Sequence, residues 1–176
     1  MNPSNLLNLG ADEPETHSGS REEELEHIKL EIIRLLNRNL ATGLDLALQA
    51  KQAHWNVKGP AFLQLHELFD RLHAEVSAWN DQLAERAVQL GGVAAGTLQA
   101  IVPSTPLSPY PGDAVAGTEH LRALVDAVRT YTRSLRASID AAERLKDPAT
   151  ADLFTELVRG ADEKLWMLEA HLQAES

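Results

Sequence analysis

The sequence contains no cysteine, so the chain forms neither disulfides nor thiolate metal sites. This absence suits a reducing compartment. The leading residues also lack a basic start followed by an apolar signal run, and no stretch reaches the roughly 18 consecutive apolar residues of a membrane-spanning helix. We therefore expect a cytoplasmic protein with no membrane partner.

Basic residues are scarce where a nucleic-acid-binding tail would need them. The formal net charge is −10, and the segment up to His27 has Arg21 as its single basic residue against seven acids. Phosphate contacts require clustered lysine and arginine, which supply most of the non-specific affinity for DNA. DNA binding is therefore expected to be weak or absent at physiological salt.

The length and the apolar content indicate one domain. The 176 residues are 44% apolar, which is enough for one sizeable core. Residues 1–20 combine Asn, Pro, Gly, Ser and acids without periodicity, which predicts a mobile tail before a domain at 21–176. Ser20 followed by Glu23 resembles a capping box that starts the first helix.

Apolar residues at helical spacing predict four long helices, at about 20–56, 61–90, 118–145 and from 149 onward. Between the second and third lies a proline-rich connection, within which residues 97–102 are expected to form a short helix. A long crossover of this kind is compatible with a four-helix bundle whose second and third helices run parallel. The expected fold class is therefore all-α.

Four potential metal ligands occupy the face of the second helix opposite its apolar stripe. His66 and Asp70 form one pair, the histidine half-site, and Asp81 and Glu85 repeat its four-residue spacing as the acidic half-site. Each pair lies on one side of a helical turn and can offer two ligands to one ion. Imidazole and carboxylate ligands without cysteine suit iron, manganese or zinc. A charged face that is merely solvated is the alternative.

One helix cannot close such a site, because His66 and Asp81 lie roughly 22 Å apart along the helix axis. If the same helix of a second subunit packs antiparallel across a two-fold axis near residues 75–76, the histidine half-site of one chain meets the acidic half-site of the other. Isologous symmetry produces this pairing twice per dimer. We therefore expect a metal site shared between subunits.

Four motifs extend this pattern along the chain. They are Lys51-Gln-Ala-His54-Trp55-Asn56-Val57-x-Gly59, Phe62-x-x-Leu65-His66-x-x-Phe69-Asp70, Asp81-x-x-Ala84-Glu85-Arg86 and Leu90-Gly91-Gly92. Together they resemble the Dps family, the DNA-binding proteins from starved cells, also called mini-ferritins. The resemblance covers roughly residues 25–172.

The resemblance implies a ferritin-like four-helix subunit assembled into a hollow homododecamer. It further implies ferroxidase centres at two-fold interfaces, which oxidise Fe(II), preferably with hydrogen peroxide, and store Fe(III) in the cage as protection against oxidative stress. Zinc would be a competitor for such centres. The family's ligands fall on His54, His66 and Asp70 of one subunit and on Asp81 and Glu85 of its partner, and the family's tryptophan beside the centre falls on Trp55.

The resemblance also points to acid-lined pores for iron entry, at the end of the third long helix and the start of the fourth. Glu143 and Asp152 are the candidates, although both also fit ordinary solvated acids near helix ends. Two other functions stay open. One is a nucleoid-compacting structural protein that binds DNA, and the other is a helical scaffold without chemistry.

Overall fold

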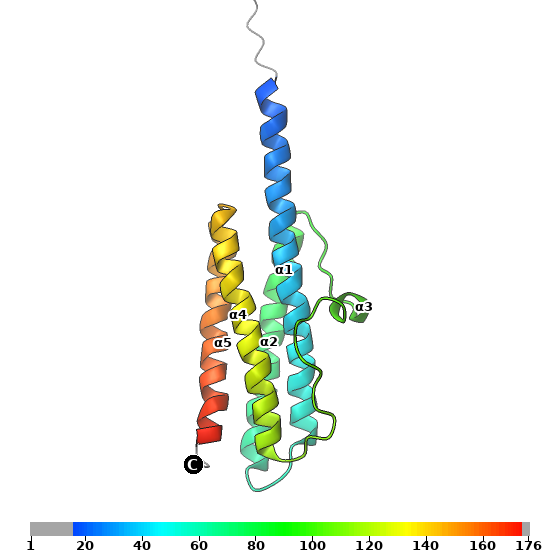
Figure 1. Ribbon diagram of the computed structural model, residues 1–176, viewed down its shortest axis with the longest axis vertical. Coiled ribbons are helices and arrows are strands. Elements are labelled where there is room, and N and C mark those ends of the chain that lie inside the picture. The colour runs from blue at the N-terminus through cyan, green and yellow to red at the C-terminus, as the bar shows by residue number, and fades with distance from the viewer. Residues whose placement is uncertain (1–15, 174–176) are drawn as a thin grey trace, which may run out of the picture.

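The computed structural model describes residues 16–173 and contains four long helices that lie side by side (Figure 1). A fifth, short helix lies in the crossover. The elements are α1 (Thr16–Asn56), α2 (Phe62–Gln89), α3 (Leu98–Ile101), α4 (Gly117–Arg144) and α5 (Pro148–Gln173). The predicted all-α fold is confirmed, and the predicted bounds of α2, α4 and α5 agree with the structure to within one or two residues.

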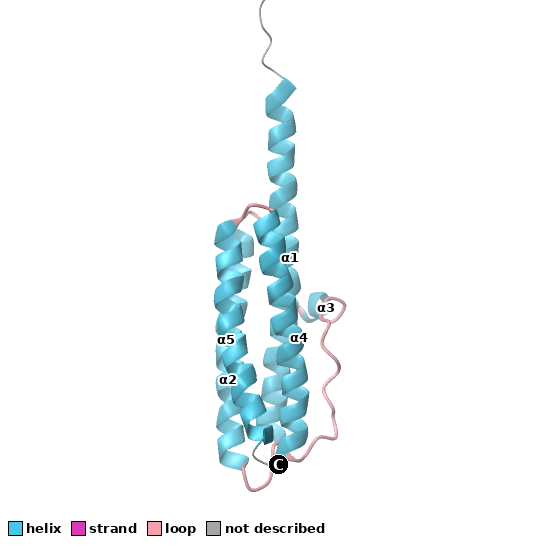
Figure 2. Cartoon of the chain, turned by 60° about the vertical axis from the view of Figure 1, so that its left-hand side comes forward, coloured by secondary structure: helices cyan, strands magenta, loops and turns pink. Residues whose placement is uncertain are grey.

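The helices pack as two antiparallel pairs, α1 with α2 and α4 with α5, and α1 also contacts α4. The crossover returns along the outside of the bundle, where α3 contacts α1 (Figure 2). Because the crossover spans the length of the bundle, α2 and α4 run parallel, as expected. No helix in residues 16–173 is both long and apolar enough to cross a membrane.

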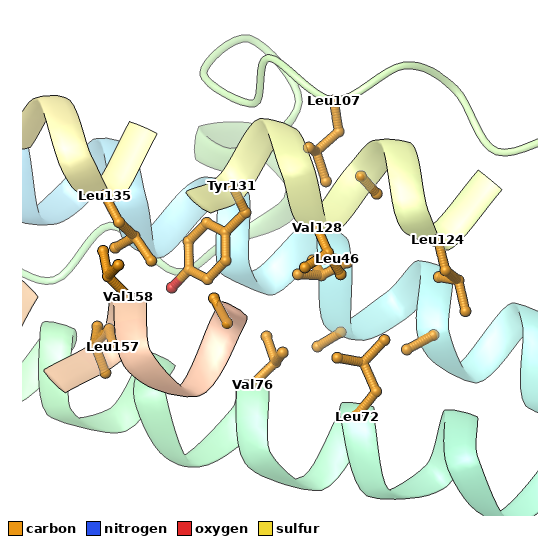
Figure 3. Packing of buried hydrophobic residues seen from close by; sticks show 14 of the residues in the cluster. Leu46, Leu72, Val76, Leu107, Leu124, Val128, Tyr131, Leu135, Leu157 and Val158 are labelled. Atoms are coloured by element: carbon orange, nitrogen blue, oxygen red, sulfur yellow. The ribbon is translucent and has the colours of Figure 1, made fainter. Parts of the chain in front are cut away.

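The apolar stripe of α2 faces the core, as its periodicity predicts. Its buried members are Leu65, Leu68, Phe69, Leu72, Val76, Leu83 and Ala87. Tyr131 projects into the same core from α4 and is fully buried, in one cluster with Val76 and Leu135 (Figure 3). With its apolar face buried, α2 turns its opposite face, which carries the candidate ligands, away from the core.

One buried position on α2 does not follow from the apolar pattern. Asn80 is buried, and it fits because α1 has no side chain at Gly43. A Cβ atom at Gly43 would lie only 2.0 Å from Asn80 Oδ1 and 3.2 Å from the Tyr131 hydroxyl. The glycine therefore permits the close approach of α1 to α2 at this level.

Helix α1 begins at Thr16, four residues before the start expected from Ser20 and Glu23. No proline lies between Thr16 and Ser20, so the chain can continue its helical hydrogen bonding through the local capping signal. Residues 16–20 of the expected tail are thus helical, and residues 1–15 lie outside the described residues. The first turns of α1 project past the ends of the other helices (Figure 1).

The turn between α4 and α5 is held by Asp147. Its Oδ1 accepts a hydrogen bond from the Thr150 backbone N–H at 3.0 Å, and its Oδ2 accepts one from the Thr150 hydroxyl at 2.7 Å. Arg86 of α2 donates to both carboxylate oxygens at 3.2 Å. Burial raises the pKa of Asp147, but the bonds from Thr150 and Arg86 outweigh it, so the pKa lies below its ordinary value.

Replacing Asp147 with Ala should lower the free energy of unfolding by about 1–2 kcal/mol at pH 7, because α5 loses its cap. A folded-state pKa below the unfolded value gives stability that is complete above about pH 4 and is lost as the pH falls through the folded pKa. Denaturant unfolding of the natural and Asp147→Ala chains should therefore show a smaller difference in the free energy of unfolding at pH 3 than at pH 7. Asp140→Ala, at an exposed position of α4, is the control. A pH-independent difference would contradict the assignment.

Candidate metal centre

A tight turn brings two histidines together where α1 ends and α2 begins. Gly59 lies in this turn with φ of +108°, a left-handed conformation that glycine adopts without strain. The chain therefore reverses within a few residues, and the rings of His54 and His66 stack with centroids 3.7 Å apart and planes 21° from parallel. The structure thus places His54 beside the histidine half-site.

The backbone fixes the orientation of both rings. Nδ1 of His54 lies 2.8 Å from the backbone carbonyl oxygen of His66, and Nδ1 of His66 lies 2.8 Å from the carbonyl oxygen of His54. A carbonyl oxygen only accepts, so each Nδ1 must carry the proton and donate. In the neutral rings each Nε2 then keeps a free lone pair. A ring N–H held by a backbone carbonyl is the usual arrangement of a metal-binding histidine.

Asp70 lies one turn beyond His66, and its side chain is 52% exposed. Lys51 of α1 forms an ion pair with Oδ1 of Asp70. The hydrogen bond from Lys51 holds the pKa of this carboxyl below its ordinary value. Asp70 is therefore an ionised carboxylate at neutral pH, on the same face of α2 as His66.

The acidic half-site lies farther along the same face. Asp81 and Glu85 are both exposed, and Asp81 is separated from Asp70 by about 16 Å of helix. Within residues 16–173 of the single chain, no group of three or more histidines, cysteines or acids lies close enough to hold a metal ion. The chain thus brings His54 and His66 together, with Asp70 on the next turn, and keeps the acidic half-site apart.

Large apolar side chains are exposed around the two histidines. Trp55 is 67% exposed, Leu63 is 60% exposed, and Phe62 is 44% exposed with its ring centroid 5.0 Å from that of His66. Exposed apolar groups gathered beside polar ligands are typical of a surface that binds another protein.

Two further side chains at this face, Lys51 and His73, have no role that the sequence predicts. Lys51, the first residue of the Lys51-Gln-Ala-His54 motif, pairs with Asp70. His73 is half-buried, and its Nδ1 lies 3.0 Å from the backbone carbonyl oxygen of Ala47. Its position seven residues after His66, two turns along the same helical face, was a signal that could have identified it.

The pore candidates lie at the other end of the bundle. Glu143 lies in the last turn of α4 and Asp152 near the start of α5, and both side chains are exposed. These helix ends are neighbours in the fold (Figure 1). The structure therefore places both acids near the same turn, on the surface of the subunit.

Comparison with known proteins identifies the family of this chain. A family model described as a ferritin-like domain matches residues 33–176. The DNA protection during starvation protein of Agrobacterium fabrum is 45% identical over 148 residues, which cover 84% of this chain and 91% of that protein. The chain belongs to the Dps family of ferritin-like proteins. Dps membership supports iron storage, iron oxidation and protection in general.

Solved Dps structures share the fold. A Dps protein from Bacillus brevis is 34% identical and superimposes with a TM-score of 0.79, covering 83% of this chain and 97% of that one. The Dps of Microbacterium arborescens in its high iron form is 29% identical with a TM-score of 0.78, covering 83% and 95%. In both comparisons the match covers nearly the whole length of the solved Dps chain.

Proposed function

We propose that this Dps chain is a ferroxidase and an iron-storage subunit. Fe(II) is its substrate, and hydrogen peroxide is the preferred oxidant. The observation that supports this most directly is the pair of stacked imidazoles whose Nδ1 atoms are bonded to carbonyls and whose Nε2 atoms are free. Neutral nitrogen ligands beside an ionised carboxylate suit Fe(II), and Zn(II) would compete with Fe(II) for the same ligands.

Each centre is proposed to lie between two subunits. One subunit supplies His54, His66 and Asp70, and the partner subunit supplies its acidic half-site, Asp81 and Glu85. Antiparallel packing of α2 on α2 around residues 75–76 pairs the two half-sites, and it would cover the exposed apolar residues beside the histidines. Ala74 and Ala78 on this face are small enough to allow two helices to approach closely.

The reaction balances without another reductant. Two Fe(II) ions each give one electron, the O–O bond of one peroxide molecule breaks, and both oxygens leave as water or hydroxide. His54 and His66 bind as neutral ligands, Asp70 and Glu85 anchor the more tightly held iron, and Asp81 completes the ligand set. Consuming Fe(II) and peroxide together limits hydroxyl-radical formation. Trp55 beside the centre is proposed to take up stray one-electron oxidants or to pack in the interface.

Twelve subunits are proposed to enclose the ferric product, in the cytoplasm. The turn between α4 and α5 would supply the entry path, with Glu143 and Asp152 drawing cations toward it. Protection of DNA, which the names of relatives describe, is proposed to arise here from iron chemistry. The net charge of −10 and the acid-rich segment up to His27 disfavour direct binding of the phosphate backbone.

Subunit complementation tests the shared centre. A His66→Ala, Asp70→Ala chain and an Asp81→Ala, Glu85→Ala chain should each assemble normally but consume peroxide poorly with Fe(II) under anaerobic conditions. Denatured together in equal amounts and refolded, they should regain about a quarter of the natural activity, because half of random dimers are mixed and each mixed dimer has one intact centre. Refolding each variant alone is the control. Centres within one subunit would give no recovery.

The pore assignment predicts a slower uptake of iron. Replacing Asp152 with Asn should slow Fe(II) entry by roughly two- to tenfold through loss of local field, while metal binding at the centre is kept. Stopped-flow mixing with Fe(II) measures the rate, and equilibrium metal titration measures the binding. Asp113→Asn removes an exposed acid in the crossover and serves as the matched control. Equal uptake rates in all three proteins would refute the role of Asp152.

The charge distribution predicts that duplex DNA is not retained at about 150 mM salt without divalent cations, since few phosphate contacts are available. A gel-shift titration of the assembled protein measures this. A clear shift under those conditions would contradict the proposal and support the nucleoid-compacting function.

A further inference from the structure

His73 repeats the contact of His66 two turns along the same pair of helices. His66 on α2 donates its Nδ1–H to the carbonyl of His54 on α1. Seven residues further along α2, Nδ1 of His73 lies 3.0 Å from the carbonyl of Ala47, which is seven residues back along α1. Both contacts thus share one antiparallel register. The difference is that α1 offers a second imidazole at the first level and only a methyl group at the second.

The repeated contact gives His73 the orientation of a metal ligand. Because the Ala47 carbonyl only accepts, Nδ1 of His73 carries the proton and Nε2 keeps its lone pair. His73 is partly exposed, on the outward face of α2. His66, Asp70 and His73 lie within about 60° of one another around α2, on its ligand face.

Asp70 lies between the two histidines and has an oxygen to spare. Lys51 donates a hydrogen bond to Oδ1 of this carboxylate, and its other oxygen, Oδ2, accepts no hydrogen bond from residues 16–173. Asp70 and His73 are three residues apart, which places them as neighbours on the helix surface.

We propose that Asp70 Oδ2 and His73 Nε2 hold a divalent cation one turn along α2 from the shared centre, to which Asp70 contributes its other oxygen, Oδ1. His73 is not among the ligands of that centre. With two protein ligands, the remaining coordination positions of the cation are filled by water. The site therefore suits a hydrated Fe(II) ion that is held weakly beside the centre. In the proposed dimer, the small Ser77 and Ala78 of the partner subunit face His73 and leave room for these waters. The identity of the cation as Fe(II) rests on the proposed function, whereas cation binding does not.

Two substitutions at one position separate ligand binding from the tether to α1. Asn at position 73 keeps an N–H donor near the place of Nδ1 but has no counterpart of Nε2. Gln reaches the place of Nε2 with an amide oxygen but gives up the donor to Ala47. His73→Asn should therefore abolish the site and keep the thermal unfolding temperature, while His73→Gln should retain weakened binding. His171→Asn, at an exposed position of α5, is the matched control.

The experiment is an anaerobic Co(II) titration of the assembled protein, read by equilibrium dialysis and visible absorption. The natural chain and His171→Asn should bind one more Co(II) per subunit than His73→Asn. An anomalous difference map from a Co(II)-soaked crystal of the natural protein should show a peak between Asp70 and His73. Equal stoichiometry in the natural and His73→Asn chains, or no such peak, would overturn the proposal. If His73→Asn fails to assemble, the map alone decides.

The same titration separates this inference from the proposed function. The Asp81→Ala, Glu85→Ala chain should lose the shared centre and keep the Co(II) ion at His73. If that chain still oxidises Fe(II) at the natural rate, the shared ferroxidase centre is refuted while the His73 site stands. If it is inactive and His73→Asn binds as much Co(II) as the natural chain, the centre stands and the His73 site is refuted.

Discussion

The antiparallel register of α1 and α2 is the constraint on which the candidate centre depends. It is set by the turn at Gly59 and fastened by the bonds between each histidine Nδ1 and the carbonyl of the other. Each bond adds only about 1 kcal/mol to stability. Its larger effect is chemical, because it fixes the tautomer and aims Nε2 outward. A shift in this register would break both bonds and separate His54 from His66 and Asp70.

The division of α2 into two faces explains why the centre needs a second subunit. Ferritin-like bundles that hold metals internally place carboxylates and histidines among the core side chains. Here Leu72 and Val76 are buried, while Asp70 and Asp81 are exposed on the other side. The core can therefore pack without a metal ion. The cost is that one chain presents only partial ligand sets, which symmetry must combine.

Hydrophobic periodicity predicted the bounds and the faces of a single helix. It did not predict contacts that depend on how two helices pack against one another. The bounds and apolar stripe of α2 follow from spacing alone, and so does the outward placement of Asp81 and Glu85. His54 could be assigned only by resemblance, since its position depends on how tightly the turn at Gly59 closes. The burial of Asn80 against Gly43 likewise depends on the distance between α1 and α2, which no single-helix pattern encodes. The pairing of half-sites between subunits stays a prediction.

Charge gives a physical reason for the two half-sites to be complementary. In the histidine half-site Lys51 already balances the charge of Asp70, and His66 and the neighbouring His54 would bind as neutral ligands, so this side of the centre carries little net charge. The acidic half-site carries two carboxylates, and Asp81 and Glu85 are both exposed to solvent. Joining the halves without a cation would leave those two charges partly desolvated in the interface, which is unfavourable. A bound Fe(II) ion compensates them, so metal binding and subunit association should strengthen one another in the proposed dimer.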